Sequence, residues 1–247
     1  MLFNSALDYR MDYLLLLSSI LLGALCVFWL KLDQPRHVKL LNAFTGAFLL
    51  SLTMLHLLPE LYANGPRPIP SWLIGTLILI GFYVQIALDA ISQGIEHGHA
   101  HHIEGRFPFG ILAGLCLHAF IEAMALGTPE THHDLQSRRL LLWSIVLHNF
   151  PVTIALLGML LHSGLSRGGA LRWLAVFAAM APLGMLVSSH TGLAEQTRPL
   201  MAIVIGIFMH ISTTILFETE DEHRMHLRKV AAIVIGTGLG VASLFME

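Results

Sequence analysis

Eight apolar runs of about 20 residues occupy most of this 247-residue chain. A helix of that length spans the hydrocarbon core of a bilayer, and it satisfies every backbone N–H and C=O within its own segment. The links between the runs are too short for a separate soluble domain. We therefore predict an all-α, multi-pass membrane protein in which residues 1–247 form a single transmembrane domain. The expected helices cover residues 13–30, 39–60, 70–93, 108–127, 139–163, 170–192, 199–217 and 228–246.

The composition supports this class of protein. The chain is 55% apolar and 12% charged, whereas a soluble domain typically carries about 25% charged residues. The formal net charge is −2, which gives no reason to expect a nucleic-acid partner. We expect the lipid bilayer to surround the chain, and we leave a homodimer open. Fifteen histidines are the one compositional anomaly, and they indicate metal or proton chemistry.

The distribution of lysine and arginine predicts which side of the membrane each link occupies. Of the 14 such residues, nine lie in the links after the first, third, fifth and seventh expected helices, and five lie elsewhere. This excess places those links in the cytoplasm and both termini outside. The first run, 13–30, lacks a small-x-small cleavage pattern before Lys31, so we expect it to remain as a helix. We predict a cell membrane, plasma or bacterial inner, as the location.

Two histidines and one glutamate lie in the middle of apolar runs. His118 and Glu122 fall in the run 108–127, and His148 falls in the run 139–163. Such groups cost at least a few kcal/mol each in hydrocarbon, so they usually have a function. The i, i+4 spacing places His118 and Glu122 on one face of a helix. Imidazole plus carboxylate suits Zn²⁺ and similar divalent ions, which makes these three residues our candidates for a central metal site.

Asn149 and Pro151 extend the candidate site. Asn149 adds an amide beside His148, and Pro151 removes the backbone hydrogen bond to the Leu147 carbonyl and kinks the helix. A carbonyl freed at membrane depth is tolerated where it faces protein or a wet cavity, and there it can serve as an oxygen ligand. We include Asn149 in the predicted central site. The alternative is that each histidine only hydrogen-bonds a neighbouring helix.

The link of about residues 94–107 is rich in histidine. It contains the run Glu-His-Gly-His-Ala-His-His-Ile-Glu. Several imidazoles in a flexible link can surround one ion, although ordering the link costs affinity. We predict a loose metal-collecting or sensing segment, and the alternative is an ordinary polar loop. The histidines concerned are His97, His99, His101 and His102.

These motifs resemble those of the ZIP family of divalent metal transporters. That family typically has a His-Asn-x-Pro-Glu-Gly-like signature in its fourth and fifth helices, which forms a two-metal centre halfway through the membrane. Here His118 and Glu122 match the histidine and acid of the fourth helix, and residues 148–151 match the start of the fifth-helix signature. The resemblance implies eight helices, both termini outside, and transport of Zn²⁺, or of Fe²⁺, Mn²⁺ or Cd²⁺, into the cytoplasm. Further matching segments are 43–48, 56–60, 181–184 and 206–210.

The departures from the family pattern remove polar ligands. Val152 stands at the second carboxylate position of the fifth helix, Ala119 at the asparagine position of the fourth, and Ala181 at the acid position of the sixth. Two divalent ions repel strongly at low dielectric, and a single Glu122 cannot offset four positive charges. We therefore expect one ion, held by the two histidines, the glutamate and either Asn149 or water.

Further polar residues lie elsewhere along the expected path. His56 and Glu60 are four residues apart near the outer end of the helix 39–60, and they are candidates for an outer metal site. Asp89 and His210 are isolated polar groups among apolar residues, and His210 is a weaker ligand candidate. For each of these residues, ordinary packing is at least as good an explanation as metal binding.

We predict a secondary transporter and not an enzyme, because the chain lacks a GxxxxGK[ST] motif for ATP and has no second mid-membrane acid beside the candidate ligands to act as a base. One alternative is a zinc-dependent intramembrane hydrolase, in which the same three ligands activate water. Another is a membrane haem protein with His118 and His148 as axial ligands.

Overall fold

The computed structural model describes residues 2–30, 34–63, 69–92, 109–127, 135–191, 197–217 and 227–245. Helices account for nearly all of these residues, which confirms the prediction of an all-α protein. In chain order the elements are α1 (Leu2–Leu30), α2 (Pro35–Leu52), the π-helical turn η1 (Thr53–Leu57), α3 (Leu58–Tyr62), α4 (Ser71–Ser92), α5 (Phe109–Met124), α6 (Leu135–His162), α7 (Arg167–His190), α8 (Thr197–Phe217), α9 (Leu227–Ala242) and the 3₁₀ turn η5 (Ser243–Phe245).

The helices are those of a multi-pass membrane protein. Within the described residues, seven segments are long and apolar enough to cross a membrane, and α5 is apolar but shorter. Because α2, η1 and α3 follow one another without a break, they form one such segment, Arg36–Tyr62. Large aromatic side chains are exposed near helix ends, for example Trp29 (79% exposed) and Trp72 (71%). Such positions suit tryptophan at a membrane–water interface.

Several helices begin earlier than hydropathy predicts. α1 begins at Leu2 rather than near residue 13, and α6 begins at Leu135 rather than residue 139. Hydropathy marks only the apolar part of a helix, whereas its hydrogen bonding continues into more polar turns. Gly168 and Gly169, expected in a link, lie in the first turn of α7. There the hydroxyl of Ser166 accepts a hydrogen bond from the Gly169 N–H at 3.2 Å, so this N-cap fixes the start of the helix.

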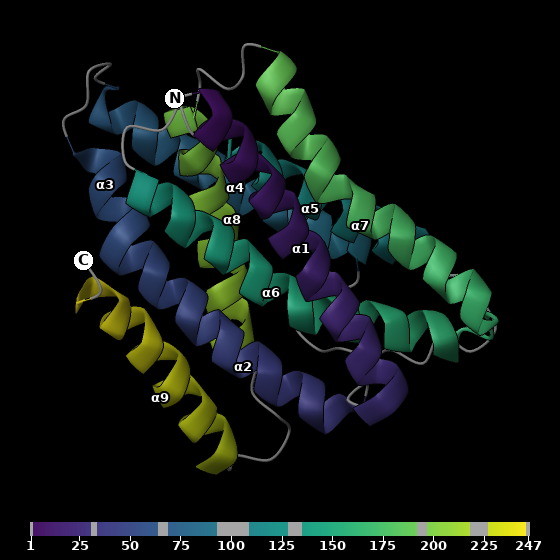
Figure 1. Ribbon diagram of the computed structural model, residues 1–247. Coiled ribbons are helices and arrows are strands. Elements are labelled where there is room, and N and C mark those ends of the chain that lie inside the picture. The colour runs from purple at the N-terminus through teal and green to yellow at the C-terminus, as the bar shows by residue number, and fades with distance from the viewer. Residues whose placement is uncertain are drawn as a thin grey trace.

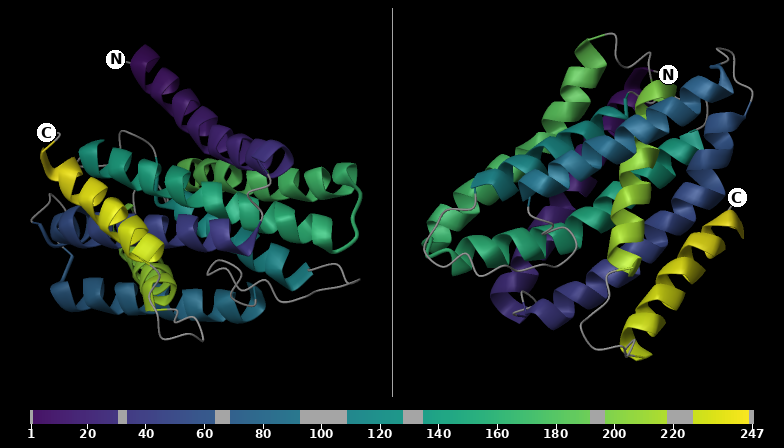
Figure 2. Two further views of the ribbon diagram at one scale, coloured as in Figure 1. Left: turned by 90° about the horizontal axis from the view of Figure 1, so that it is seen from below. Right: turned by 180° about the vertical axis from the view of Figure 1, so that it is seen from behind.

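The helices form two groups that pack against each other (Figure 1). In the first group, α4 packs extensively against α8, and α2 packs against both α8 and α9. In the second group, α5 packs against α7, and α1 and α7 each pack against α6. The groups meet chiefly where α4 contacts α5 and where α2 contacts α6. Figure 2 shows α9 at the outer edge, beside α2. We call these the α4/α8 group and the α5/α6 group.

Glycines allow helices within each group to approach closely. A Cβ atom built on Gly81 of α4 would lie 1.9 Å from the Ile203 carbonyl oxygen of α8, and one on Gly206 of α8 would lie 2.0 Å from the Ile78 carbonyl oxygen. Gly184 of α7 lies in the same way against the backbone of α5. Small residues at such contacts let transmembrane helices gain close packing, which lipid cannot offer equally well.

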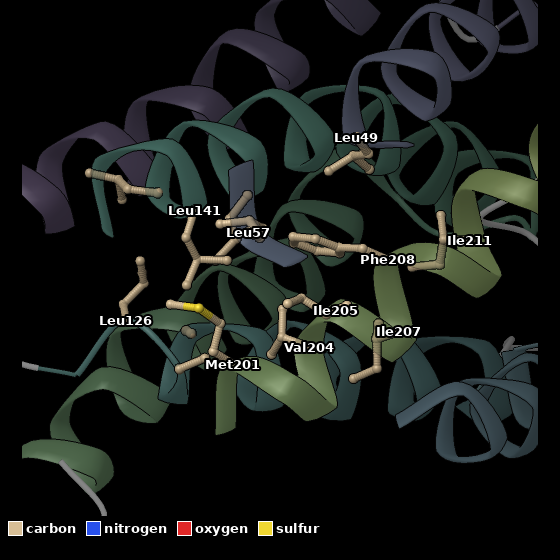
Figure 3. Close-up of a cluster of buried hydrophobic side chains, with 14 of the residues drawn as sticks. Leu49, Leu57, Leu126, Leu141, Met201, Val204, Ile205, Ile207, Phe208 and Ile211 are labelled. Atoms are coloured by element: carbon tan, nitrogen blue, oxygen red, sulfur yellow. The ribbon is translucent and has the colours of Figure 1, made fainter. Parts of the chain in front are cut away.

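A cluster of buried apolar side chains around α8 joins the two groups (Figure 3). Met201, Ile205 and Phe208 of α8 gather there with Leu57 of η1 and Leu141 of α6. All five side chains are almost completely buried. Because lipid tails are as apolar as leucine, this cluster stabilises the bundle through tight packing more than through removal from water.

Two arginines link neighbouring helices at one end of the bundle through hydrogen bonds. Arg138, at the start of α6, donates to Asp12 of α1 at 2.6 Å and to the Leu126 carbonyl at 3.0 Å. Arg198, at the start of α8, donates to two carbonyls at the end of α3, each at 2.7 Å. A cation at a helix C-terminus is favourable because the carbonyls there carry partial negative charge. The start of α1 and the end of α9 lie toward this same end (Figure 1).

We expect Gly206→Ala to destabilise the protein. The added methyl group would overlap the backbone oxygen of Ile78, and overpacking of this kind costs about 1–3 kcal/mol or more. Gly238→Ala on α9 is the matched control, because a Cβ atom there meets nothing within 4 Å and alanine favours a helix. Thermal unfolding in detergent should show a lower Tm for Gly206→Ala only. Equal Tm values for the two variants would contradict the close α4–α8 contact.

Candidate metal centre

The fold brings His118, Glu122 and His148 together in the interior. His118 and Glu122 lie one turn apart on α5, and His148 lies midway along α6. Among the described residues, they are the one group of three or more histidine, cysteine, aspartate or glutamate side chains whose potential ligand atoms all lie within 4.8 Å of one another. We call these three residues the central trio.

The ligand atoms of the central trio are close to the spacing that a metal ion needs. His118 Nε2 lies 2.9 Å from Glu122 Oε1. The rings of His118 and His148 meet edge to face, with centroids 5.7 Å apart and an interplanar angle of 79°. Ligands of a tetrahedral zinc ion lie roughly 3.3 Å apart, given bonds of about 2.0–2.1 Å. Small changes in side-chain torsions would therefore bring all three residues onto one ion.

The central trio is shut off from solvent. The exposed fractions of His118, Glu122 and His148 are 2%, 0% and 1%. In the part of the chain that the structure describes, neither carboxylate oxygen of Glu122 has a hydrogen-bond donor of suitable geometry. A buried carboxylate is costly unless a cation or a proton accompanies it. The centre is therefore suited to a positively charged partner.

Other buried polar atoms lie on the helices of the centre. Asn149 of α6 is 1% exposed. Its amide nitrogen, the Thr153 hydroxyl on the same helix and the Ser188 hydroxyl on α7 have no hydrogen-bond partner among the described residues. Such orphaned groups often mark positions where water or an ion binds. The role of Asn149 as a ligand stays a prediction.

The three departures from the family pattern lie in the apolar interior. Ala119, Val152 and Ala181 are each no more than 3% exposed, and they belong to clusters of buried apolar side chains. Glu122 is thus the one acid in the metal-ligand group found among the described residues. The side chains of the centre supply a single negative charge.

Asp89 and His210, which are isolated polar residues within apolar runs of the sequence, pair with each other in the structure. His210 Nε2 of α8 lies 2.6 Å from Asp89 Oδ2 of α4, and the ring of Phe82 packs edge to face against His210 at 4.9 Å. The close approach of α4 and α8 brings these side chains together, and hydropathy reveals no pairing of that kind. His210 does not belong to the group of ligands around His118.

The remaining candidates are placed separately. His56 lies in η1, where its Nε2 is 2.9 Å from the Ser243 hydroxyl, and Glu60 lies on α3. The described residues place no third ligand with this pair, so an outer metal site there stays a prediction. Outside the described residues lie the histidines of the predicted link, His97, His99, His101 and His102.

Gln85 was not among the site residues that we predicted from the sequence. This residue is completely buried on α4, and its Oε1 lies 3.0 Å from Nδ1 of His118. The available signal was a lone glutamine in an apolar run, four residues before Asp89. That spacing places both side chains on one helix face, but it does not reveal which helix they meet.

The family model described as ZIP zinc transporter matches residues 108–244, more than half of the chain and all of the central trio. The chain belongs to the ZIP family. The resemblance inferred from the motifs is thereby confirmed, and the matched region begins just before α5 and continues through α9 into η5.

Three ZIP-family relatives show how much of a longer protein this chain resembles. Zinc transporter ZIP9 of Xenopus tropicalis is 27% identical over 172 residues, which cover 64% of this chain and 57% of that protein. ZIP9-B of Xenopus laevis is 28% identical over 152 residues, covering 57% and 50%. ZIP9 of Micropogonias undulatus is 27% identical over 152 residues, covering 57% and 49%. The chain thus spans about half the length of these curated relatives.

We expect the centre to hold one divalent ion. Two such ions about 4 Å apart would repel each other by roughly 16 kcal/mol at an effective dielectric constant of 20, and Glu122 alone cannot offset this. Elemental analysis of zinc-loaded protein should give one ion per chain, once ions on the predicted link have been removed by His97→Ala, His99→Ala, His101→Ala and His102→Ala. Adding His118→Ala and His148→Ala should remove that ion. Two tightly held ions in the first protein would contradict the expectation.

Proposed function

We propose that this protein carries a divalent cation, Zn²⁺ first, across the membrane through the central trio. The observation that carries the proposal is the buried group of His118, Glu122 and His148, whose ligand atoms lie within 4.8 Å of one another. The imidazole and carboxylate ligands suit zinc, and family membership supports transport. Fe²⁺, Mn²⁺ and Cd²⁺ are alternative cargoes.

The charge of the centre suits an ion that must leave again. One divalent ion beside Glu122 gives a net charge of +1, and the two imidazoles add no negative charge. An ion held by few charges is bound less tightly than one in an acid-rich site, and conduction requires binding that is weak enough for release. We infer alternating access, in which the α4/α8 group moves against the α5/α6 group and opens the centre to one side at a time.

We propose that both termini lie outside and that the ion moves into the cytoplasm of a cell bounded by this membrane. The lysine and arginine distribution supports this orientation, and the direction rests on the resemblance to ZIP transporters. The positions of the two ends of the chain fit this orientation, because the start of α1 and the end of α9 lie toward the same end of the bundle (Figure 1).

The geometry of the central trio argues against a zinc-dependent hydrolase and against a haem protein. A zinc hydrolase needs a general base beside the metal, but the one acid of the metal-ligand group is itself a ligand candidate. A haem iron bound at His118 Nε2 would have to displace the carboxylate of Glu122, which lies 2.9 Å from that nitrogen. A small bare cation fits between these groups, and we propose transport without catalysis.

Zinc flux into liposomes tests the proposed function. Purified protein is reconstituted around a zinc-sensitive dye, and uptake is followed after Zn²⁺ is added outside. His118→Ala, Glu122→Gln and His148→Ala should each reduce uptake at least about tenfold, since each removes a direct ligand and the loss of a mere supporting partner already costs about 10–100-fold.

His162→Ala is the matched control for His148→Ala. His162 lies at the exposed end of α6, where its Nδ1 is 2.6 Å from the Gly158 carbonyl oxygen. This control should transport zinc at the wild-type rate. Unchanged flux in all three variants of the central trio would refute the proposed function. The same assay with Fe²⁺, Mn²⁺ and Cd²⁺ ranks the cargoes.

A further inference from the structure

A chain of polar contacts leads away from the central trio into the α4/α8 group. His118 Nδ1 lies 3.0 Å from Gln85 Oε1, and Gln85 Nε2 donates to Asp89 Oδ1 at 2.8 Å. The other oxygen of Asp89, Oδ2, lies 2.6 Å from His210 Nε2. These contacts connect α5 with α4 and then α4 with α8. The contact between His118 and Gln85 crosses the boundary between the two helix groups.

Asp89 determines which way the Gln85 amide faces. The oxygen and nitrogen of a glutamine amide are assigned from their hydrogen-bond partners. A carboxylate accepts hydrogen bonds and does not donate them, so the NH₂ group of Gln85 must face Asp89. His210 donates to the second oxygen of that carboxylate and holds it in place. The amide oxygen of Gln85 is therefore left facing His118.

The amide orientation in turn determines which nitrogen of His118 carries a proton. An amide oxygen only accepts, so the Nδ1 that faces it must be the N–H of a neutral imidazole. The lone pair then lies on Nε2, the nitrogen that is 2.9 Å from Glu122. We propose that Gln85, oriented by Asp89 and His210, is a positioning residue that fixes His118 in the Nδ1–H tautomer and aims its Nε2 at the ion. This inference rests on the proposed function, because it assigns a task to a residue behind that metal centre.

If Gln85 positions His118, replacing Gln85 should lower the metal affinity even though every direct ligand is still present. Replacing a group that orients a metal-binding histidine typically lowers affinity 10–100-fold. Gln85→Met keeps the length of the side chain but can neither accept from His118 nor donate to Asp89. Gln85→Glu keeps a carboxyl oxygen that accepts from Nδ1–H. We therefore expect about a tenfold weaker zinc affinity for Gln85→Met and an affinity at least as tight as wild type for Gln85→Glu, whose carboxylate adds negative charge behind His118.

The affinity experiment uses full-length protein in which the four link histidines are replaced by alanine. Zinc binding is measured by competition with a chromophoric chelator for the wild-type Gln85, for Gln85→Met and for Gln85→Glu. Thr76→Val is the matched control on the same helix, because Thr76 is exposed and its hydroxyl donates to the Trp72 carbonyl of its own helix at 2.8 Å. It should bind zinc as tightly as wild type.

A second measurement does not need the Gln85 variants to fold. Nitrogen-15 NMR of histidine-labelled, zinc-loaded protein shows which nitrogen of His118 carries a proton and which binds metal, and His118→Gln assigns the signal. We expect Nδ1–H with Nε2 on zinc. Zinc on Nδ1, or equal zinc affinity in Gln85→Met and wild type, would overturn the role of Gln85 and leave the proposed function intact. If His118→Ala binds zinc as tightly as wild type, the metal centre itself is refuted, and the role of Gln85 with it.

Discussion

The buried carboxylate of Glu122 is the constraint on which the centre depends. It is fully enclosed in an apolar bundle, where an isolated charge is too costly to persist. Its neighbours in the central trio, His118 and His148, are imidazoles that can be neutral and can each give a lone pair to an ion. A divalent cation would therefore satisfy the carboxylate and both histidines together. No rearrangement of apolar side chains could do the same.

The geometry behind the centre depends on how closely the helices approach. Gly81 precedes Gln85 by one turn on α4, and its missing side chain lets the backbone of α8 come into contact. The same approach allows His210 to reach Asp89. A wider spacing of α4 and α8 would separate that pair and leave the Gln85 amide without a fixed orientation. Backbone packing at two glycines thus bears on the orientation of His118, the proposed metal ligand on a third helix, α5.

Most of the fold could be predicted from the sequence, because a hydrocarbon environment permits little besides helices of a certain length. The central trio was also predictable, since histidine and glutamate in apolar runs are rare and the i, i+4 spacing fixes their common face. Gln85 and the Asp89–His210 pair were not, because their partners lie on other helices. Which faces meet is decided by glycine contacts that hydropathy does not measure. The early start of α1 was missed for the related reason that polar turns also form helix.

The contacts from His118 through Gln85 to Asp89 and His210 also explain how a histidine ligand can be oriented without the ion being held too tightly. A carboxylate behind His118 would orient the ring, but it would add a second negative charge near the ion and hold the cargo more tightly. Gln85 supplies the same hydrogen-bond acceptor with no net charge. The negative charge of Asp89 lies behind Gln85, one hydrogen bond further from the proposed ion. The contact of Gln85 with His118 also crosses between the two helix groups. Movement of one group against the other would loosen that contact and weaken the grip on the ion, so the step that opens the centre would also favour release.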